Sequence, residues 1–82
     1  MKSKVIDFNI VNKQIQIVNR PPLNAEFELY DLTGRLILRQ SMPFDENIPN
    51  FFDLPLLSPE IYIMVGRVGN EKCSKTFYYG NH

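Results

Sequence analysis

The sequence predicts an all-β fold, in which antiparallel strands, about seven in number, pack as a β-sandwich. Turn signals recur roughly every 8 to 12 residues, the runs between them are rich in β-branched and aromatic residues, and no run shows helical periodicity. A chain of 82 residues has the length of one small domain. We therefore expect residues 1–82 to form a single sandwich domain.

Two strands are predicted before the first strong break in the pattern. Residues 5–10 alternate imperfectly between apolar and polar side chains, and residues 14–18, QIQIV, alternate cleanly. The weak turn signal Asn12-Lys13 separates them, and Pro21-Pro22 ends the pattern because two prolines remove two backbone donors. The apolar side chains expected to share one face of each strand are Ile6, Phe8 and Ile10, then Ile15 and Ile17.

Residues 25–41 are predicted to form a β-hairpin around which the rest of the chain is organised. Two apolar runs flank Asp31-Leu32-Thr33-Gly34, which has Asp at the first position of the turn and Gly at the fourth. We expect a type I turn with Gly34 in the left-handed region and a bulge at Gly34. The Asp31 carboxylate can then accept backbone N–H groups and contact the guanidinium of Arg35, which lies opposite it.

The form of this turn also determines the register of the hairpin. The bulged turn places Leu29 opposite Ile37. A plain two-residue turn would instead pair Leu29 with Leu38, and it would move the side chains of one strand to the opposite face. The bulged register is the one that we expect.

The middle of the chain is predicted to cross between the sheets. Residues 42–47, MPFDEN, form the crossing loop, and residues 48–54 form a short edge strand because Pro49 cannot donate to a ladder. The segment that follows is too apolar for a solvated loop. Three of its leucines are expected to close one end of the core: Leu54, Leu56 and Leu57.

A second hairpin is predicted at the end of the chain. Residues 61–68, IYIMVGRV, are almost continuously apolar, as in a central strand that is covered on both faces, or on one face and by a partner on the other. Gly69-Asn70 supplies a turn, and residues 72–79 form the last strand.

Charge and hydropathy argue against several classes of protein. Nine Lys and Arg balance nine Asp and Glu, so the basic surface of a nucleic-acid or anionic-membrane binder is not expected. No run approaches the roughly 20 apolar residues of a membrane span. Residues 5–14 are too polar for the apolar region of a signal peptide. The absence of net charge also means that a homodimer would form against little electrostatic repulsion.

No catalytic, cofactor-binding or metal-binding site is expected. The single histidine, His82, is the last residue, and with the single cysteine, Cys73, it provides neither a zinc site nor a Cys-His nucleophile pair. Asp45, Glu46 and Asp53 match no dedicated calcium loop. We therefore expect no cofactor, no metal and no enzyme activity.

Three stretches resemble a known family. They are LYDLTGRLI at 29–37, DLPLLSP at 53–59 and IYIMV at 61–65, and Lys75 stands where that family tends to have a lysine in its last strand. In order and spacing they resemble the C-terminal sorting domain of the type IX (Por) secretion system. The resemblance implies an Ig-like β-sandwich that addresses cargo to the outer-membrane translocon. It also implies a secreted or cell-surface location when the domain is part of a longer exported protein.

A protein is the expected partner under two alternative functions. A sorting domain would bind the secretion machinery, whereas a free-standing interaction module would bind a second copy or another protein through an edge strand or an aromatic face. The rings of 77–79 are expected on both faces of the last strand, and the exposed rings would form an aromatic contact patch with Tyr62 of the neighbouring strand. The candidate contact residues are Arg35, Tyr62, Lys75, Phe77, Tyr78 and Tyr79. Structural roles explain the same residues without a partner, because rings can pack across strands and Arg35 can stabilise the turn.

Overall fold

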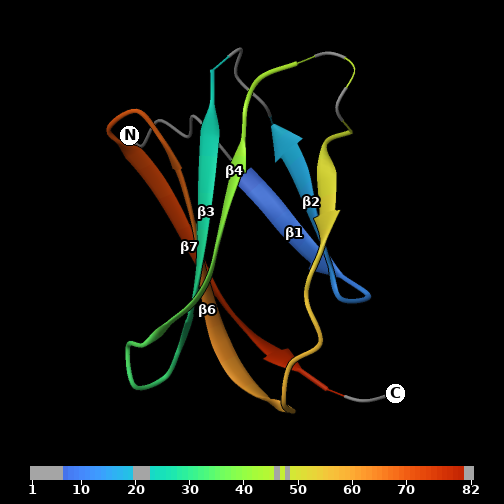
Figure 1. Ribbon diagram of the computed structural model, residues 1–82, viewed down its shortest axis with the longest axis vertical. Coiled ribbons are helices and arrows are strands. Elements are labelled where there is room, and N and C mark those ends of the chain that lie inside the picture. The colour runs from blue at the N-terminus through green and yellow to red at the C-terminus, as the bar shows by residue number, and fades with distance from the viewer. Residues whose placement is uncertain (1–6, 20–22, 46, 48, 81–82) are drawn as a thin grey trace.

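The computed structural model describes residues 7–19, 23–45, 47 and 49–80, and this part of the chain contains seven strands and no helix. One sheet has the order β1 (Asp7–Val11), β2 (Gln14–Asn19), β5 (Phe51–Asp53). The other has the order β4 (Leu36–Met42), β3 (Ala25–Asp31), β6 (Glu60–Val68), β7 (Glu71–Tyr79). All pairings are antiparallel, and the two sheets lie face to face (Figure 1). The predicted all-β sandwich of about seven strands is confirmed.

The core lies between the sheets and is centred on an aromatic cluster. The Phe27 ring of β3 lies 5.4 Å from the Phe8 ring of β1 and 5.3 Å from the Phe52 ring of β5, measured between centroids. Rings from both sheets therefore meet at Phe27. The buried hydrophobic residues are Phe8, Ile15, Ile17, Ala25, Phe27, Leu29, Met42, Leu54, Tyr62, Met64, Val68 and Tyr79.

The first hairpin turns more tightly than its sequence suggested. Asn12 and Lys13 have φ values of 51° and 65°, and positive φ at both central residues is the geometry of a type I′ turn. This turn pairs β1 with β2, and the clean alternation of 14–18 puts Ile15 and Ile17 into the core as predicted. Residues 5 and 6 of the first predicted strand lie outside the described residues.

The central hairpin has the predicted turn, but its register differs farther along the strands. The Gly34 N–H donates to the Asp31 carbonyl at 3.0 Å, the Asp31 N–H donates to the Arg35 carbonyl at 3.1 Å, and Gly34 has a φ of 89°. The expectation that Leu29 lies opposite Ile37 is wrong, because Leu29 pairs with Leu38. The register shifts between Leu29 and Tyr30, where β4 contains one extra residue.

Replacing Gly34 with valine is expected to destabilise the domain by about 1–3 kcal/mol. The positive φ of Gly34 is unfavourable for any residue with a Cβ and most unfavourable for a β-branched one, although a Cβ would meet nothing within 4 Å. Gly34→Asn is the matched control, since asparagine tolerates this region. Urea denaturation of both variants tests the prediction, and equal midpoints for valine and asparagine would contradict it.

The strand that follows the crossing from β4 is shorter than predicted. Only Phe51–Asp53 forms β5, although the Ile17 N–H also donates to the Asn50 carbonyl and the Leu54 N–H to the Lys13 carbonyl. Residue 48 of the predicted strand 48–54 lies outside the described residues. Among the three leucines expected to close the core, Leu54 is buried and Leu57 packs against the core. The expectation for Leu56 is wrong, because this residue is 92% exposed.

The last hairpin places β6 in the interior of its sheet and β7 at the edge. β6 pairs with β3 on one side and with β7 on the other, which confirms the central position predicted for 61–68. One face of β6 is buried, whereas on the other face Ile63 and Val65 are half-buried and Ile61 is exposed. β6 is therefore covered by the opposite sheet on one face only.

Candidate functional site

Three of the predicted contact residues, Tyr62, Phe77 and Tyr79, form an aromatic cluster that faces the opposite sheet. The Tyr62 ring lies 6.2 Å from the Phe77 ring and 6.3 Å from the Tyr79 ring. Tyr62 and Tyr79 are buried and Phe77 packs against the core. The expectation that Tyr62 belongs to an exposed patch is therefore wrong, and packing across strands accounts for all three rings.

Tyr62 also ties the start of β6 to the segment before it. Its hydroxyl donates to the Ser58 carbonyl at 2.8 Å, and burial raises the pKa of this hydroxyl. A buried tyrosine near the start of a strand that bonds to backbone a few residues upstream is the arrangement called a tyrosine corner. This role of Tyr62 was not predicted from the sequence. The tyrosine at the second position of the predicted strand 61–68 was the signal that could have found it.

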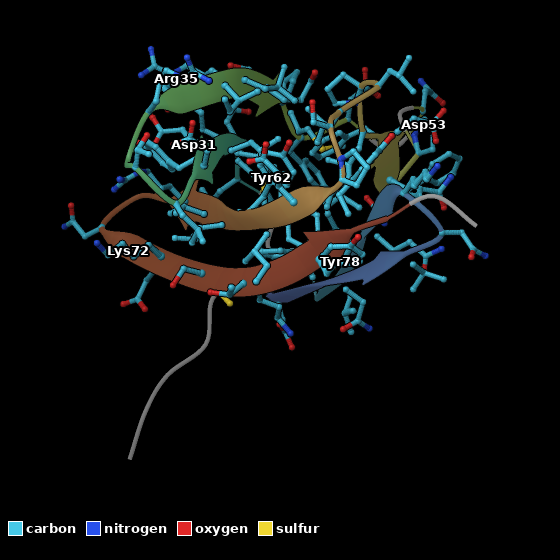
Figure 2. All side chains as sticks on the ribbon, turned by 90° about the horizontal axis from the view of Figure 1, so that it is seen from below. Asp31, Arg35, Asp53, Tyr62, Lys72 and Tyr78 are labelled. Carbon is cyan, nitrogen blue, oxygen red and sulfur yellow. The ribbon has the colours of Figure 1, made fainter. Side chains whose placement is uncertain are left out.

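Tyr78 is the aromatic residue of β7 that faces outward. It is 63% exposed and pairs across the strands with Ile61, which is also exposed. Lys72 and Tyr78 lie near the two ends of β7 (Figure 2). Ile61 and Tyr78 together form a small apolar contact area on the outer face of the four-stranded sheet, of the aromatic kind that is enriched at interfaces.

Lys75 points to the opposite sheet and contacts β1. Its Nζ lies 3.5 Å from Asp7 Oδ1 and 5.8 Å from the centroid of the Phe8 ring. The Cys73 thiol lies 3.9 Å from the same Asp7 oxygen. Lys75 therefore links the two sheets at the edge formed by β7, and it does not share the outer face with Tyr78.

Within the described residues, the backbone of β7 pairs with another strand on one side only. Its nine residues pair with β6, and no other strand in the described part of the chain pairs with β7. An edge strand of this kind presents backbone N–H and C=O groups that an added strand can bind.

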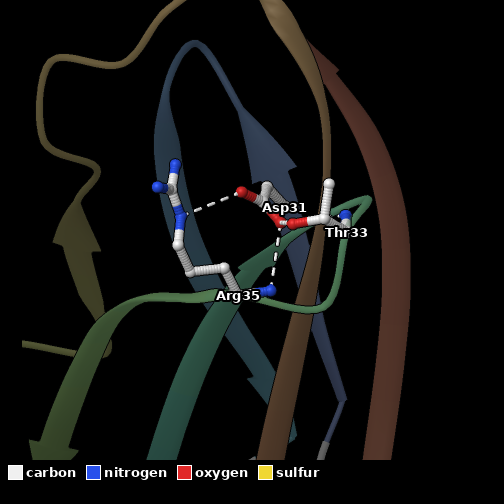
Figure 3. A network of polar contacts seen from close by, with 3 residues as sticks. All are labelled: Asp31, Thr33 and Arg35. Carbon is white, nitrogen blue, oxygen red and sulfur yellow. Dashed lines mark hydrogen bonds and ion pairs between the residues drawn. The ribbon is translucent and has the colours of Figure 1, made fainter.

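Arg35 and Asp31 form the predicted contact across the turn. Arg35 Nε lies 3.2 Å from Asp31 Oδ2, while Asp31 Oδ1 accepts from the Thr33 N–H at 2.9 Å, the Thr33 hydroxyl at 2.6 Å and the Arg35 N–H at 3.0 Å (Figure 3). The Thr33 hydroxyl contributes most to holding the pKa of the Asp31 carboxyl below its ordinary value, with the two N–H groups and the guanidinium adding to it and burial opposing. These contacts give Arg35 a structural role.

A second polar network, which was not predicted from the sequence, lies on the outer face of the four-stranded sheet. The buried carboxylate of Glu28 accepts from the Tyr30 hydroxyl at 2.9 Å and lies 3.2 Å from Arg39 Nη2 and from Arg67 Nε. The Tyr30 hydrogen bond is the largest cause that holds the pKa of Glu28 below its ordinary value. Arg67 and Arg39 also lower this pKa, and burial opposes them.

Acid is expected to destabilise the domain through both carboxylates. Because Glu28 and Asp31 have lowered pKa values in the folded state, their stabilisation is present above the unfolded pKa and is lost as the pH falls through the folded pKa. The urea midpoint should therefore decrease from about pH 5 towards pH 2. Thr33→Ala removes the hydroxyl that most lowers the pKa of Asp31, so its midpoint should depend less on pH than that of Thr33→Ser. Equal pH dependence in the two variants would contradict this account.

A hollow of about 390 Å³ lies where the β1–β2 turn meets the end of β7. Lys13 Nζ lies 5.1 Å from the centroid of the Tyr79 ring at this place. Within the ranges that the structure describes, no three His, Cys, Asp or Glu side chains are grouped so that they could hold a metal ion. The lining residues are Ile10, Asn12, Lys13, Leu54, Phe77, Tyr78, Tyr79 and Gly80.

Comparison of the chain with protein-family models, with curated proteins and with solved structures finds no match. Among the described residues, no helix has the length and hydropathy to cross a membrane. The arrangement of the strands and side chains is therefore the basis on which a function is proposed.

Proposed function

We propose that the chain is a non-enzymatic, Ig-like β-sandwich domain that binds a protein partner through β7. The observation that carries this proposal is the position of β7, which is a strand of nine residues at the edge of the four-stranded sheet. An incoming strand can bind the free side of its backbone, while exposed side chains of the partner contact its outer face.

Two features support an Ig-like classification. The strands divide into a sheet of three and a sheet of four, as in sandwiches of this class. Here β4 belongs to the four-stranded sheet, where it pairs with β3. The hydrogen bond from the Tyr62 hydroxyl to the Ser58 carbonyl corresponds to the tyrosine corner of such domains.

The outer face of β7 has side chains suited to a specific contact. Lys72, Ser74, Thr76 and Tyr78 alternate along it and are all exposed. A strand added beside β7 would gain backbone hydrogen bonds, and Tyr78 would gain an apolar contact. Following the resemblance to type IX sorting domains, we assign the partner to the export machinery, with the domain secreted or at the cell surface as part of a longer exported protein.

A second copy of the chain is the alternative partner for the same edge. The inward side chains of β7, Cys73, Lys75 and Phe77, are only half-buried, whereas Met64 and Tyr62 beside them on β6 are buried. A strand added beside β7 would cover this side of the core. The formal net charge of zero offers little opposition to self-association.

The export role can be tested with substitutions of exposed side chains. Removing residues 75–79 would also remove Tyr79 from the core, so loss of export would then have two explanations. The double variant Thr76→Glu/Tyr78→Ser changes the outer face of β7 alone, and Ser41→Glu makes a matched change on the exposed edge strand β4. Each would be fused to a reporter in a type IX-competent cell.

We expect the β7 double variant to reduce export several-fold and Ser41→Glu to export as the unchanged domain does. Denaturation midpoints would establish that all three domains are folded. Export of the folded β7 variant at the unchanged level would refute the role of this face. Light scattering on the isolated domain tests the alternative, because a strictly monomeric domain would exclude pairing between copies.

A further inference from the structure

We propose that the outer face of the four-stranded sheet binds an acidic protein segment through Arg39 and Arg67, with Glu28 as the residue that positions both guanidinium groups. This inference goes beyond the proposed function, because it concerns a surface centred on β3, β4 and β6 and does not require the β7 edge.

The register of three strands brings these side chains together. Glu28 of β3 pairs directly with Arg39 of β4, and Arg67 of β6 pairs with Glu26, two residues before Glu28. The two arginines therefore approach Glu28 from opposite sides. Each contacts a different carboxylate oxygen at 3.2 Å, Arg39 through Nη2 and Arg67 through Nε.

The burial of these groups is unequal, and this determines what remains available for binding. The Glu28 side chain is 8% exposed, while the side chains of Arg39 and Arg67 are 57% and 44% exposed. Glu28 Oε1 also accepts from the Tyr30 hydroxyl at 2.9 Å, so both oxygens of the carboxylate are in use. Arg67 contacts the Glu28 carboxylate through Nε, and its side chain also forms a hydrogen bond with Tyr30. A guanidinium has five N–H donors, so most donors of both arginines remain for a ligand.

The charges favour an anion as that ligand. Two guanidinium groups share one carboxylate, and Lys72 of β7 pairs across the strands with Arg67. Glu26 is the acidic neighbour on β3, and it is half-buried. A carboxylate from outside can bind an arginine fork through two parallel hydrogen bonds, which a planar guanidinium held in place by Glu28 favours.

The neighbouring side chains favour a peptide over a small anion. Val65 pairs with Glu28 and Ile63 with Tyr30, and both are half-buried, so an apolar strip runs along β6 beside the arginines. A segment in which acidic and apolar residues alternate would place its carboxylates on Arg39 and Arg67 and its apolar side chains on this strip. Inorganic phosphate could bind the two arginines but has no apolar group to contact the strip on β6.

The test is a titration followed by NMR at the Arg Nε–Hε groups. The probes are a blocked hexapeptide of alternating Glu and Leu, the same peptide with Gln in place of Glu, and inorganic phosphate. We expect saturable shifts of the Arg39 and Arg67 signals with the Glu peptide alone. Arg39→Gln and Arg67→Gln should each weaken this binding by about tenfold, as expected for a lost charge-assisted hydrogen bond.

Arg35→Gln is the matched control, because Arg35 is also an exposed arginine paired with one carboxylate, outside the cluster. It should change the affinity by less than about twofold. Equal weakening by Arg35→Gln, equal binding of the Gln peptide, or equal binding of phosphate would overturn the proposal. Equal weakening by Arg35→Gln would indicate general charge attraction. Equal binding of the Gln peptide would indicate an apolar contact, and equal binding of phosphate would indicate a simple anion site.

Glu28→Ala tests the positioning role separately. It removes a negative charge from the site, so charge alone predicts tighter binding of the Glu peptide. Loss of positioning predicts weaker binding, together with increased motion of the Arg39 and Arg67 Nε–Hε groups in the heteronuclear NOE. We expect the weaker binding. Tighter binding in the folded variant would refute the role of Glu28, and the two arginine variants decide the site itself if Glu28→Ala does not fold.

Discussion

Replacing Phe27 with alanine is expected to reduce the free energy of unfolding by about 3–5 kcal/mol. Phe27 is 1% exposed, and its ring contacts Phe8 of β1 and Phe52 of β5 at centroid distances of 5.4 and 5.3 Å. Truncation would leave a cavity lined by both sheets. Because small domains are stable by only about 5–15 kcal/mol, the variant should lie close to the limit of folding.

Urea denaturation followed by circular dichroism measures this loss, and Phe51→Ala is the matched control. Phe51 is the same residue type and lies beside Phe52 in β5, but its side chain is exposed. Its substitution should change stability by about 0.5 kcal/mol or less. A small effect of Phe27→Ala, comparable with that of Phe51→Ala, would mean that the two sheets do not pack on Phe27.

Local patterns in the sequence were sufficient to predict the class of fold and the positions of the turns. The alternation in 14–18 placed Ile15 and Ile17 in the core, and Asp31 with Gly34 specified the central turn, including the contact to Arg35. These features depend on residues that are close in the chain, so their geometry follows from backbone preferences and short-range hydrogen bonds.

Features that depend on distant residues were not predictable in the same way. Leu29 pairs with Leu38 because β4 contains an extra residue beyond the turn, which the turn itself does not specify. Leu56 is exposed although its neighbour Leu54 is buried, since burial there depends on where the segment passes the sandwich.

The candidate sites show the same limit. Tyr62 was expected on an exposed face, and its place in the core depends on which face of β6 meets the other sheet. Glu28 and Arg67 are 39 residues apart in sequence, and they meet only because β3 pairs with β6 in one register. Such a cluster can be recognised in a sequence only after the order and register of the strands are known.

Replacing Gly66 with alanine is expected to destabilise the domain by about 1–3 kcal/mol. Inside a strand the same replacement normally stabilises the fold, because glycine loses more conformational entropy on folding than alanine. Gly66 lies in the interior of β6 opposite Phe27 of β3. A Cβ at this position would lie 2.8 Å from Phe27 Cε1 and 3.4 Å from Phe8 Cε1. The Phe27 ring would have to move, and its contacts with Phe8 and Phe52 oppose the movement.

A double-mutant cycle separates this steric cause from a general effect of the substitution. Phe27→Leu removes the atom that the new Cβ would approach, so Gly66→Ala should cost less in that background by about 0.5 kcal/mol or more. Phe51→Leu is the control background, because Phe51 is exposed, and there Gly66→Ala should cost as much as in the unchanged domain. Additive losses in the Phe27→Leu background would contradict the clash. In that case the space that Phe27 requires between the sheets would not be the reason why residue 66 is glycine.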